Sequence, residues 1–356
     1  MSGGTSRVLI VKLGAIGDVI MAIPGAYALH QRGAQIDWIC APAVAPLLDC
    51  YPWIRTIVAD DRAILAGSIL PRLRALIKLW SQIGDCRYDL RATLYYDARY
   101  KLLTLPVRAK RKLMLSRTDR DLRLIPTRSH SDEYVRILLD HEDSYRAHSA
   151  TPVRPERLPE SPLCLRSTPI RVGIVPGGAS NMLRQQVLRR WPVARYVELT
   201  QELINRGYEV VLLGGPDDIW VRPEFDKLPV LDAIGALSLP EVVAACDTCD
   251  AIVSHDTGPM HLAGLSRAAL VCLFGPTDPG SFLPRRKQVR GIWGGEGFAC
   301  RPCYDGRDFA PCRDNGCMQQ ITTPMVLRQL DALLAERASG MIRSQLVVRP
   351  SSMSRL

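Results

Sequence analysis

Aromatic residues and long apolar runs are scarce in this sequence. Only 6% of its 356 residues are aromatic, and they are not interleaved with basic residues. A surface that stacks single-stranded nucleic acid is therefore disfavoured. No segment approaches the roughly 20 apolar residues of a membrane-spanning helix. Apolar residues nevertheless make up 47% of the chain, which excludes a mainly disordered protein and is enough for two packed domains of ordinary size.

The sequence also lacks the features of a secreted protein. The eleven cysteines are an odd number, and most are single residues in apolar segments, such as Cys40 and Cys272. This usage is typical of a reducing compartment. The apolar stretch that follows Arg7 and Lys12 is interrupted by Asp18 and by glycines, which favours a strand, a turn and a helix over a signal peptide. We expect a cytoplasmic protein that contacts the inner membrane surface only peripherally.

The N-terminal segment predicts a βαβ unit with a glycine-containing turn. Residues 7–12 form a short β-branched apolar run typical of a buried parallel strand, residues 13–18 (LGAIGD) form the turn, and residues 19–31 form a helix. A nicotinamide-binding fingerprint needs three glycines spaced as Gly-x-Gly-x-x-Gly. Only Gly14 and Gly17 are present, so an NAD-linked oxidoreductase is disfavoured.

Asp18 lies where this turn meets the helix, at the carboxyl end of the strand. Open α/β sheets bind their ligands at this position. Aspartate is a common helix cap, and a carboxylate at the mouth of a sheet can also act as a general base toward a substrate hydroxyl. The residues alone leave both roles open.

The formal net charge of +10 predicts an acidic partner. Basic residues alternate with apolar ones over residues 62–80 and are dense again over residues 99–112. Solvated helix faces explain any single residue here, but two such stretches favour an acidic acceptor or anionic headgroups. With the glycines of the first turn, the candidate acceptor-binding residues are Gly14, Gly17, Arg72, Arg74, Lys78, Arg99 and Lys101.

The chain is predicted to contain two domains. A proline-rich segment with few apolar residues, 156–169, predicts a linker between a first domain, 1–155, and a second, 170–340. Strands and glycine turns alternate in the second domain as in the first. The remaining tail, 341–356, contains arginines and serines and is expected to be disordered.

The second domain is organised around residues 251–263 (AIVSHDTGPMHLA). A buried strand is predicted to end in the turn 256–258, and Pro259 suits the first position of a helix. The free N–H groups at such a helix start bind phosphate groups, although an ordinary capped turn is equally compatible. The glycine turns 176–180 and 214–218 also follow strands, so all three turns should line one edge of the sheet.

Four cysteines close to the C-terminus form a separate cluster. They lie in a segment rich in glycine, proline and aspartate that has little to pack with. Four thiolates suit zinc or iron, and four protein ligands would leave no open position, so such a metal would be structural. Reduced thiols in a flexible loop are the alternative. The candidate metal ligands are Cys300, Cys303, Cys312 and Cys317.

Taken together, these motifs resemble glycosyltransferase family nine, the ADP-heptose heptosyltransferases of lipopolysaccharide core assembly. The resemblance extends to about residue 338. The segments that carry it are KLGAIGD (12–18), PGGAS (176–180), the basic residue before Trp191, LGGPDD (213–218), and SHDTGPMHLA through LFGPTDP (254–279).

The resemblance implies an α/β protein of GT-B architecture, with two Rossmann-like domains facing across a cleft. The acceptor would bind to the N-terminal domain and the nucleotide sugar to the C-terminal domain. The implied reaction is an inverting transfer that requires no cofactor, in which Asp18 deprotonates the acceptor hydroxyl. The implied donor-binding residues are Gly177, Gly178, Arg189, Asp218, Asp256, Thr257, Gly258, Pro259, Met260 and His261.

Three details of the sequence qualify the resemblance. Arg189 stands where the family usually has lysine, and arginine differs from lysine in geometry. His255 stands where asparagine is common, which leaves its role open. The cysteine cluster is similar to that of a family branch that glycosylates autotransporter adhesins and carries iron on four cysteines.

The predicted function is transfer of a heptose from ADP-heptose to a lipopolysaccharide core or similar acidic glycolipid, with no nucleic-acid partner. Use of another nucleotide sugar, or glycosylation of a protein, is the alternative within the family. A non-catalytic module that binds polyanions and an NAD-linked oxidoreductase are the less favoured alternatives outside it.

Overall fold

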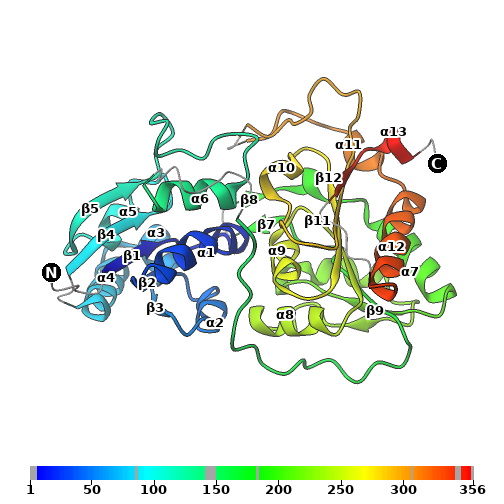
Figure 1. The fold of residues 1–356 in the computed structure, drawn as a ribbon, viewed down its shortest axis with the longest axis horizontal. Helices are drawn as coiled ribbons and strands as arrows, with labels where there is room; N and C mark the ends of the chain where they lie inside the picture. Colours follow the sequence, from blue (N-terminus) through cyan, green and yellow to red (C-terminus); the bar gives the residue numbers. More distant parts are fainter. Residues whose placement is uncertain are drawn as a thin grey trace. The chain divides into compact units, whose positions relative to one another are not determined.

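The chain divides into two compact units, residues 1–157 and 158–356, in a computed structural model (Figure 1). The boundary falls inside the proline-rich segment 156–169. Within the part of the chain that the structure describes, no helix is both long enough and apolar enough to cross a membrane. The described residues are 6–84, 87–140, 150–181, 184–305, 308–340 and 346–353.

The first unit is built on a five-stranded parallel sheet with the order β3-β2-β1-β4-β5. The order reverses between β1 and β4, so the connections that follow these two strands diverge. A crevice at the carboxyl edge of such a sheet is the usual ligand site. The strands are β1 (Arg7–Val11), β2 (Gln35–Cys40), β3 (Ile54–Val58), β4 (Arg87–Thr93) and β5 (Arg108–Met114).

Helices cover this first sheet. Helices α1 and α6 pack against each other. Leu9 and Val11 of β1 share an apolar core with Leu76 and Leu79 of α4. The helices of the unit are α1 (Ile16–Gln31), α2 (Ala45–Leu48), α3 (Asp61–Ala66), α4 (Ile69–Ile83), α5 (Tyr100–Leu103) and α6 (His130–Leu138).

The second unit repeats this plan with seven parallel strands in the order β10-β9-β6-β11-β12-β13-β14. Its order reverses between β6 and β11, which places the expected ligand crevice at the ends of these two strands. The strands are β6 (Arg171–Ile174), β9 (Glu209–Leu212), β10 (Leu231–Asp232), β11 (Ala251–His255), β12 (Ala269–Phe274), β13 (Val289–Trp293) and β14 (Leu346–Val348).

Two short strands and a set of helices complete the second unit. β7 (Ser180–Asn181) and β8 (Arg184–Gln185) form an antiparallel pair. The helices are η1 (Val187–Arg189), α7 (Val193–Asn205), η2 (Pro216–Glu224), α8 (Leu239–Asp247), α9 (Gly258–Leu265), α10 (Pro279–Phe282), α11 (Gly316–Gln319), α12 (Thr323–Ala338) and α13 (Pro350–Met353).

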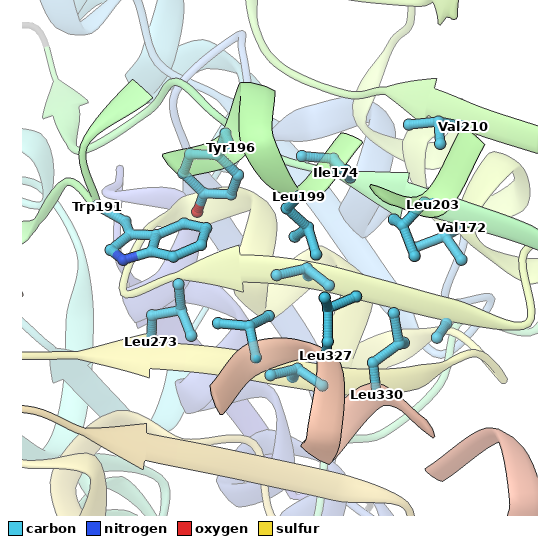
Figure 2. Packing of buried hydrophobic residues seen from close by; sticks show 14 of the residues in the cluster. Val172, Ile174, Trp191, Tyr196, Leu199, Leu203, Val210, Leu273, Leu327 and Leu330 are labelled. Atoms are coloured by element: carbon cyan, nitrogen blue, oxygen red, sulfur yellow. The ribbon is translucent and has the colours of Figure 1, made fainter. Parts of the chain in front are cut away.

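A single apolar core holds α7 and α12 against the second sheet (Figure 2). Trp191 and Tyr196 meet edge to face, with ring centroids 4.8 Å apart. Leu199 of α7 and Leu330 of α12 are fully buried in the same cluster. Burying side chains of this size contributes about 1.5–3 kcal/mol each, so this core fixes the sheet edge on which the candidate site lies.

Two expectations about element boundaries need correction. The helix expected at 19–31 begins three residues earlier, at Ile16, and Ala15 is its N-cap residue. The tail expected to be disordered contains β14, which pairs in parallel with β13, and α13. Its run of branched apolar residues favours an edge strand, and Val348 is buried there. The rest of the tail, 341–345 and 354–356, lies outside the described residues.

Candidate functional site

Asp18 lies in the first turn of α1, directly after the turn that follows β1. Because Ala15 is the N-cap residue, Asp18 is not the helix cap that the sequence left open as one of its roles. Its Oδ2 lies 3.2 Å from Nζ of Lys12, with Asp18 33% exposed and Lys12 only 2% exposed. The carboxylate is therefore held from the protein side and remains accessible from the solvent side.

Lys12 is a functional candidate that the sequence reasoning missed. Its ammonium lies 5.2 Å from the ring centroid of Tyr95 and 5.8 Å from that of Tyr134. A buried ammonium needs a compensating partner, and Asp18 supplies the negative charge. Tyr95 and Tyr96 follow β4, so this pair lies at the crevice where the strand order reverses. Burial raises the pKa of Tyr96, and the nearby Asp18 carboxylate also raises it.

Asp218 joins the glycine turns of the second unit. Its Oδ1 accepts a hydrogen bond from the N–H of Gly178 at 2.5 Å, and its Oδ2 accepts one from the N–H of Gly215 at 2.8 Å. A Cβ atom on Gly177 would lie only 2.6 Å from the Asp218 side chain. Both carboxylate oxygens thus serve the backbone. Asp218 therefore holds the two glycine turns together, and direct donor binding by Asp218 and Gly177 stays a prediction.

Thr257 connects the two strands at which the sheet order reverses. Its hydroxyl accepts a hydrogen bond from the N–H of Ala179 at 2.8 Å, which ties the turn after β11 to the turn after β6. Gly178 packs directly against this contact. Its φ is +88°, and a Cβ atom there would lie 2.4 Å from Oγ1 of Thr257. Only glycine satisfies both constraints.

Asp256 is neutralised within the site. The Thr277 hydroxyl donates to its Oδ2 at 2.6 Å, and Nη1 of Arg189 lies 3.4 Å from the same oxygen. Asp256 itself is 2% exposed. A lone carboxylate at this position would repel a phosphate group. In the structure a cation and a hydroxyl offset the charge of Asp256.

Three aromatic rings surround the Arg189 guanidinium. Its Cζ lies 5.7 Å from the ring centroid of Phe282, 5.3 Å from that of Tyr304 and 5.4 Å from that of Phe309. Tyr304 and Phe309 form an antiparallel bridge inside the cysteine-containing segment. This segment therefore contributes to the placement of Arg189, a contact that the sequence did not reveal.

Arg190 supports the same turn from its other side. Its Nε donates to the carbonyl of Gly178 at 2.8 Å, and its guanidinium lies 4.8 Å from the ring centroid of Trp220. Burial lowers the pKa of Arg190. The sequence reasoning singled out only Arg189, so Arg190 is a second cation at this edge.

The start of α9 presents few backbone donors. Gly258 and Pro259 are partly exposed, whereas Met260 and His261 are buried. Pro259 has no N–H, and the N–H of Met260 bonds to the carbonyl of Thr257 at 3.1 Å. The prediction of direct donor contact for Met260 and His261 therefore finds no support in their burial. The N–H of Gly258 is the donor best placed for an anion.

His255 belongs to the core beneath this turn. It is fully buried, and its Nδ1 lies 2.9 Å from the hydroxyl of Tyr196. Burial lowers the pKa of His255 to about 3, against a smaller raising effect of Asp256. The side chain is thus a neutral packing residue at physiological pH.

The predicted acceptor-binding residues do not form one group. Gly14 lies in the turn after β1 and Gly17 in the first turn of α1, next to Asp18. Arg72, Arg74 and Lys78 lie on α4, whose buried side faces the sheet. Lys101 lies on α5, next to Arg99.

Two of these arginines are occupied within the protein. Arg72 donates to the carbonyl of Gly67 at 2.9 Å. Arg99 pairs with Asp97 at 2.6 Å and donates to the carbonyl of Leu65 at 3.0 Å. Acceptor binding by these two arginines stays a prediction.

The predicted four-cysteine metal site is not assembled. Over residues 6–353, apart from the gaps given above, no group of three or more His, Cys, Asp or Glu side chains is placed to hold a metal ion. Cys300 and Cys312 are exposed, whereas Cys303 and Cys317 are partly buried. Burial raises the pKa of Cys317 to about 11, with the neighbouring thiols adding to the effect. The donor set has the right chemistry for zinc or iron, but the described thiols are not arranged as a metal-binding group.

Comparisons with known proteins agree with this geometry. Residues 173–312 match the family model Glycosyltransferase family 9 (heptosyltransferase). Lipopolysaccharide heptosyltransferase 3 of Escherichia coli is 29% identical over 162 residues, which cover 44% of this chain and 46% of that protein. The match thus spans less than half the length of this curated relative.

Solved structures extend the similarity to both units. The structure of E. coli ADP-heptose lps heptosyltransferase II matches with a TM-score of 0.67 at 21% identity, over 93% of this chain and 99% of that one. The iron-containing dodecameric glycosyltransferase TibC from enterotoxigenic E. coli matches with a TM-score of 0.59 at 17% identity, over 92% of this chain and 76% of that one. The predicted α/β fold class of GT-B type, with two Rossmann-like units, is confirmed.

Proposed function

Because residues 173–312 match the model of glycosyltransferase family 9, we propose that the chain is a member of this family and transfers a heptose from ADP-heptose to a lipopolysaccharide-type acceptor, with inversion at the anomeric carbon. One observation carries the proposal within the structure. Thr257 joins the turns after β6 and β11 at the reversal of the second sheet, between Asp256, which pairs with Arg189, and Gly258 at the start of α9. This arrangement supports the proposal of a site for a diphosphate.

We assign donor binding to the second domain, residues 170–340. Arg189 and the N–H of Gly258 would hold the diphosphate, and the start of α9 would stabilise the charge that develops on the leaving phosphate. Asp256 would act through Arg189, because its Oδ2 already contacts that side chain and Thr277.

We assign acceptor binding to the first domain, residues 1–155, with Asp18 as general base. The Asp18 carboxylate takes the proton of an acceptor hydroxyl while that oxygen bonds to the anomeric carbon. The bond from this carbon to the phosphate oxygen breaks, and its electron pair leaves with ADP. Lys12 orients the carboxylate from the buried side. General-base assistance of this kind typically gives about 10²–10⁴-fold.

Calorimetric titration of the full chain with ADP-heptose, ADP and a UDP-sugar tests the donor assignment. We expect ADP and ADP-heptose to bind and the UDP-sugar to bind more weakly. A protein that binds no nucleotide diphosphate sugar is not this enzyme.

Asp18→Asn should keep donor affinity and lose about 10²-fold or more in turnover. Asp119→Asn, an exposed aspartate of the same unit, is the matched control and should keep full turnover.

Two finer statements belong to the same proposal. Catalysis is proposed to need no cofactor, and a zinc or iron ion bound to Cys300, Cys303, Cys312 and Cys317 would be structural. The iron-containing solved structure supports this assignment, although the four sulfur atoms would have to move together to bind an ion. The protein is proposed to work in the cytoplasm at the inner membrane surface, where a glycolipid acceptor would lie.

A further inference from the structure

Helix α4 carries two apolar faces, of which the sheet covers one. Leu76, Leu79 and Ile83 are buried against the first sheet. A second row consists of Ile69, Leu70, Leu73 and Ile77, which are 47% to 80% exposed. The spacing of this row, i, i+1, i+4 and i+8, places it on one side of the helix. An ordinary surface helix is polar on its outward side, so this second face requires an explanation.

The neighbouring helix α5 extends the exposed apolar row. The indole N–H of Trp80 on α4 donates to the carbonyl of Leu102 at 3.1 Å, which joins the two helices. Leu102 and Leu105 are both exposed. We call the six exposed apolar side chains of these two joined segments the outer apolar face of the first unit: Ile69, Leu70, Leu73, Ile77, Leu102 and Leu105.

Basic side chains adjoin this outer apolar face. Arg74 and Lys78 are exposed on α4, and Lys101 is exposed on α5. None of the three forms an ion pair with an acidic side chain of the described residues. Apolar side chains bordered by available cations match the interface of an anionic bilayer, with acyl chains next to headgroups. A second copy of this face would bring like charges together, which disfavours self-association.

The orientation of α4 relates this face to Asp18. α4 connects the carboxyl end of β3, through α3, to the amino end of β4. Because the strands are parallel, α4 starts toward the carboxyl edge of the sheet, where Asp18 lies, and ends toward the opposite edge. Ile69 and Leu70 are therefore at the end of the helix that is nearer the catalytic candidate.

We propose that the outer apolar face of α4 and α5 inserts into the headgroup region of an anionic phospholipid membrane, with Arg74, Lys78 and Lys101 contacting lipid phosphates. The proposal deepens the proposed function, since it would bring the Asp18 edge to a membrane that holds a lipid-linked acceptor. It reassigns three of the predicted acceptor-binding residues to the bilayer, and its test measures binding to lipid and not turnover.

Co-sedimentation of the full chain with vesicles tests the proposal. One set is phosphatidylcholine alone, and the other contains 30 mol% phosphatidylglycerol, each at low and high salt. We expect binding to the anionic vesicles only, weakened by salt. Leu70→Ser/Ile77→Ser and Arg74→Glu/Lys78→Glu should each weaken binding by about tenfold or more. The matched controls are Leu165→Ser and Lys227→Glu, exposed residues of the second unit, and they should bind as the parent does.

Three outcomes would overturn the proposal. The parent chain could bind neither vesicle, the face variants could bind as the parent does, or the parent could be a dimer that Leu70→Ser/Ile77→Ser converts to a monomer. Turnover of Leu70→Ser/Ile77→Ser on a soluble, lipid-free acceptor fragment should equal that of the parent, which shows that the variant folds. Vesicle binding without any binding of ADP-heptose would sustain this inference and reject the proposed function.

Discussion

Lys12 and Asp18 form an ion pair across the turn after β1, with 3.2 Å between Nζ and Oδ2, and only the aspartate reaches solvent. The pair gives the two residues separable roles. Asp18 can meet a substrate, whereas Lys12 lies between two tyrosine rings and can act only through Asp18.

A double-mutant cycle should separate these roles. Asp18→Asn leaves the buried Lys12 ammonium without its carboxylate and should lower the free energy of unfolding by about 1–3 kcal/mol. Adding Lys12→Met removes the uncompensated charge, so the double variant should regain much of this stability while its turnover stays as low as that of Asp18→Asn. Urea denaturation and steady-state rates measure the two effects. Recovery of turnover in the double variant would contradict the assignment of Asp18 as base.

The Gly178 turn predicts a loss of donor binding that backbone strain alone does not explain. Gly178→Ala adds a Cβ atom 2.4 Å from Oγ1 of Thr257 at a φ of +88°. Gly207 has a similar φ of +78°, but nothing lies within 4 Å of its added Cβ. In both variants the free energy of unfolding should fall by about 1 kcal/mol, because alanine is disfavoured in the left-handed conformation. Only Gly178→Ala should weaken ADP binding, by about tenfold or more, in calorimetric titration.

Equal ADP affinity in Gly178→Ala and Gly207→Ala would place the donor away from this turn. Thr257→Val provides an independent check, because it removes the acceptor for the N–H of Ala179 while nearly conserving side-chain volume. It should weaken ADP binding in the same direction as Gly178→Ala.

The aromatic rings around Arg189 predict that the cysteine-containing segment influences donor affinity. Tyr304→Leu removes one ring at 5.3 Å from Cζ of Arg189, and a cation–π contact of this kind contributes about 0.5–2 kcal/mol. We expect a rise in the KM for the donor of about threefold to tenfold with little change in kcat. Tyr304→Phe keeps the ring and is the matched control. If both variants behave alike, the hydroxyl and not the ring is responsible.

The sequence predicted elements best where a segment is buried on both faces. A strand was expected at 7–12 and β1 is found at 7–11, because residues 8–11 form a continuous apolar run whose side chains are buried. β5 (Arg108–Met114) was interpreted only as a basic stretch. Its exposed basic residues alternate with less exposed ones at the edge of the sheet, a pattern that charge obscures. The same stretch also holds α5.

For the site, the sequence identified residues that share a local motif and missed those that meet only in space. Asp18 and residues 256–258 each follow a strand end, and parallel α/β topology places each of them at the carboxyl edge of its own sheet. Thr277 contacts Asp256 across 21 residues of sequence, and no spacing rule connects Tyr304 to Arg189. Met260 is buried, and this burial depends on tertiary packing around α9 that the sequence does not show. Met260 was assigned to donor binding only because it belongs to the motif.

The four-cysteine segment predicts a measurable metal content. Inductively coupled plasma analysis of purified protein should give about one zinc or iron per chain if the four thiolates bind one ion. Cys300→Ser/Cys312→Ser should remove the metal, and Cys164→Ser, which changes another exposed thiol, should retain it. Substoichiometric metal in the parent protein would leave the segment as reduced thiols. Because Tyr304 and Phe309 lie in this segment, loss of the metal should also raise the donor KM.

His255 predicts how stability depends on pH. Burial lowers its pKa to about 3 in the folded protein, whereas an unfolded histidine titrates near pH 6.5. Between these values the unfolded chain binds a proton that the folded protein does not. The contribution of His255 to the free energy of unfolding is therefore constant above about pH 6.5 and falls as the pH drops toward 3, by about 1.4 kcal/mol per pH unit.

His255→Asn should be less stable than the parent at pH 8, because it loses the contact with Tyr196, but its stability should decline less steeply between pH 6 and 4. Urea denaturation across this range measures the slope, and His30→Asn, which changes a histidine outside the buried core, should leave it unchanged. A parent slope that His255→Asn does not reduce would mean that other groups dominate the acid response.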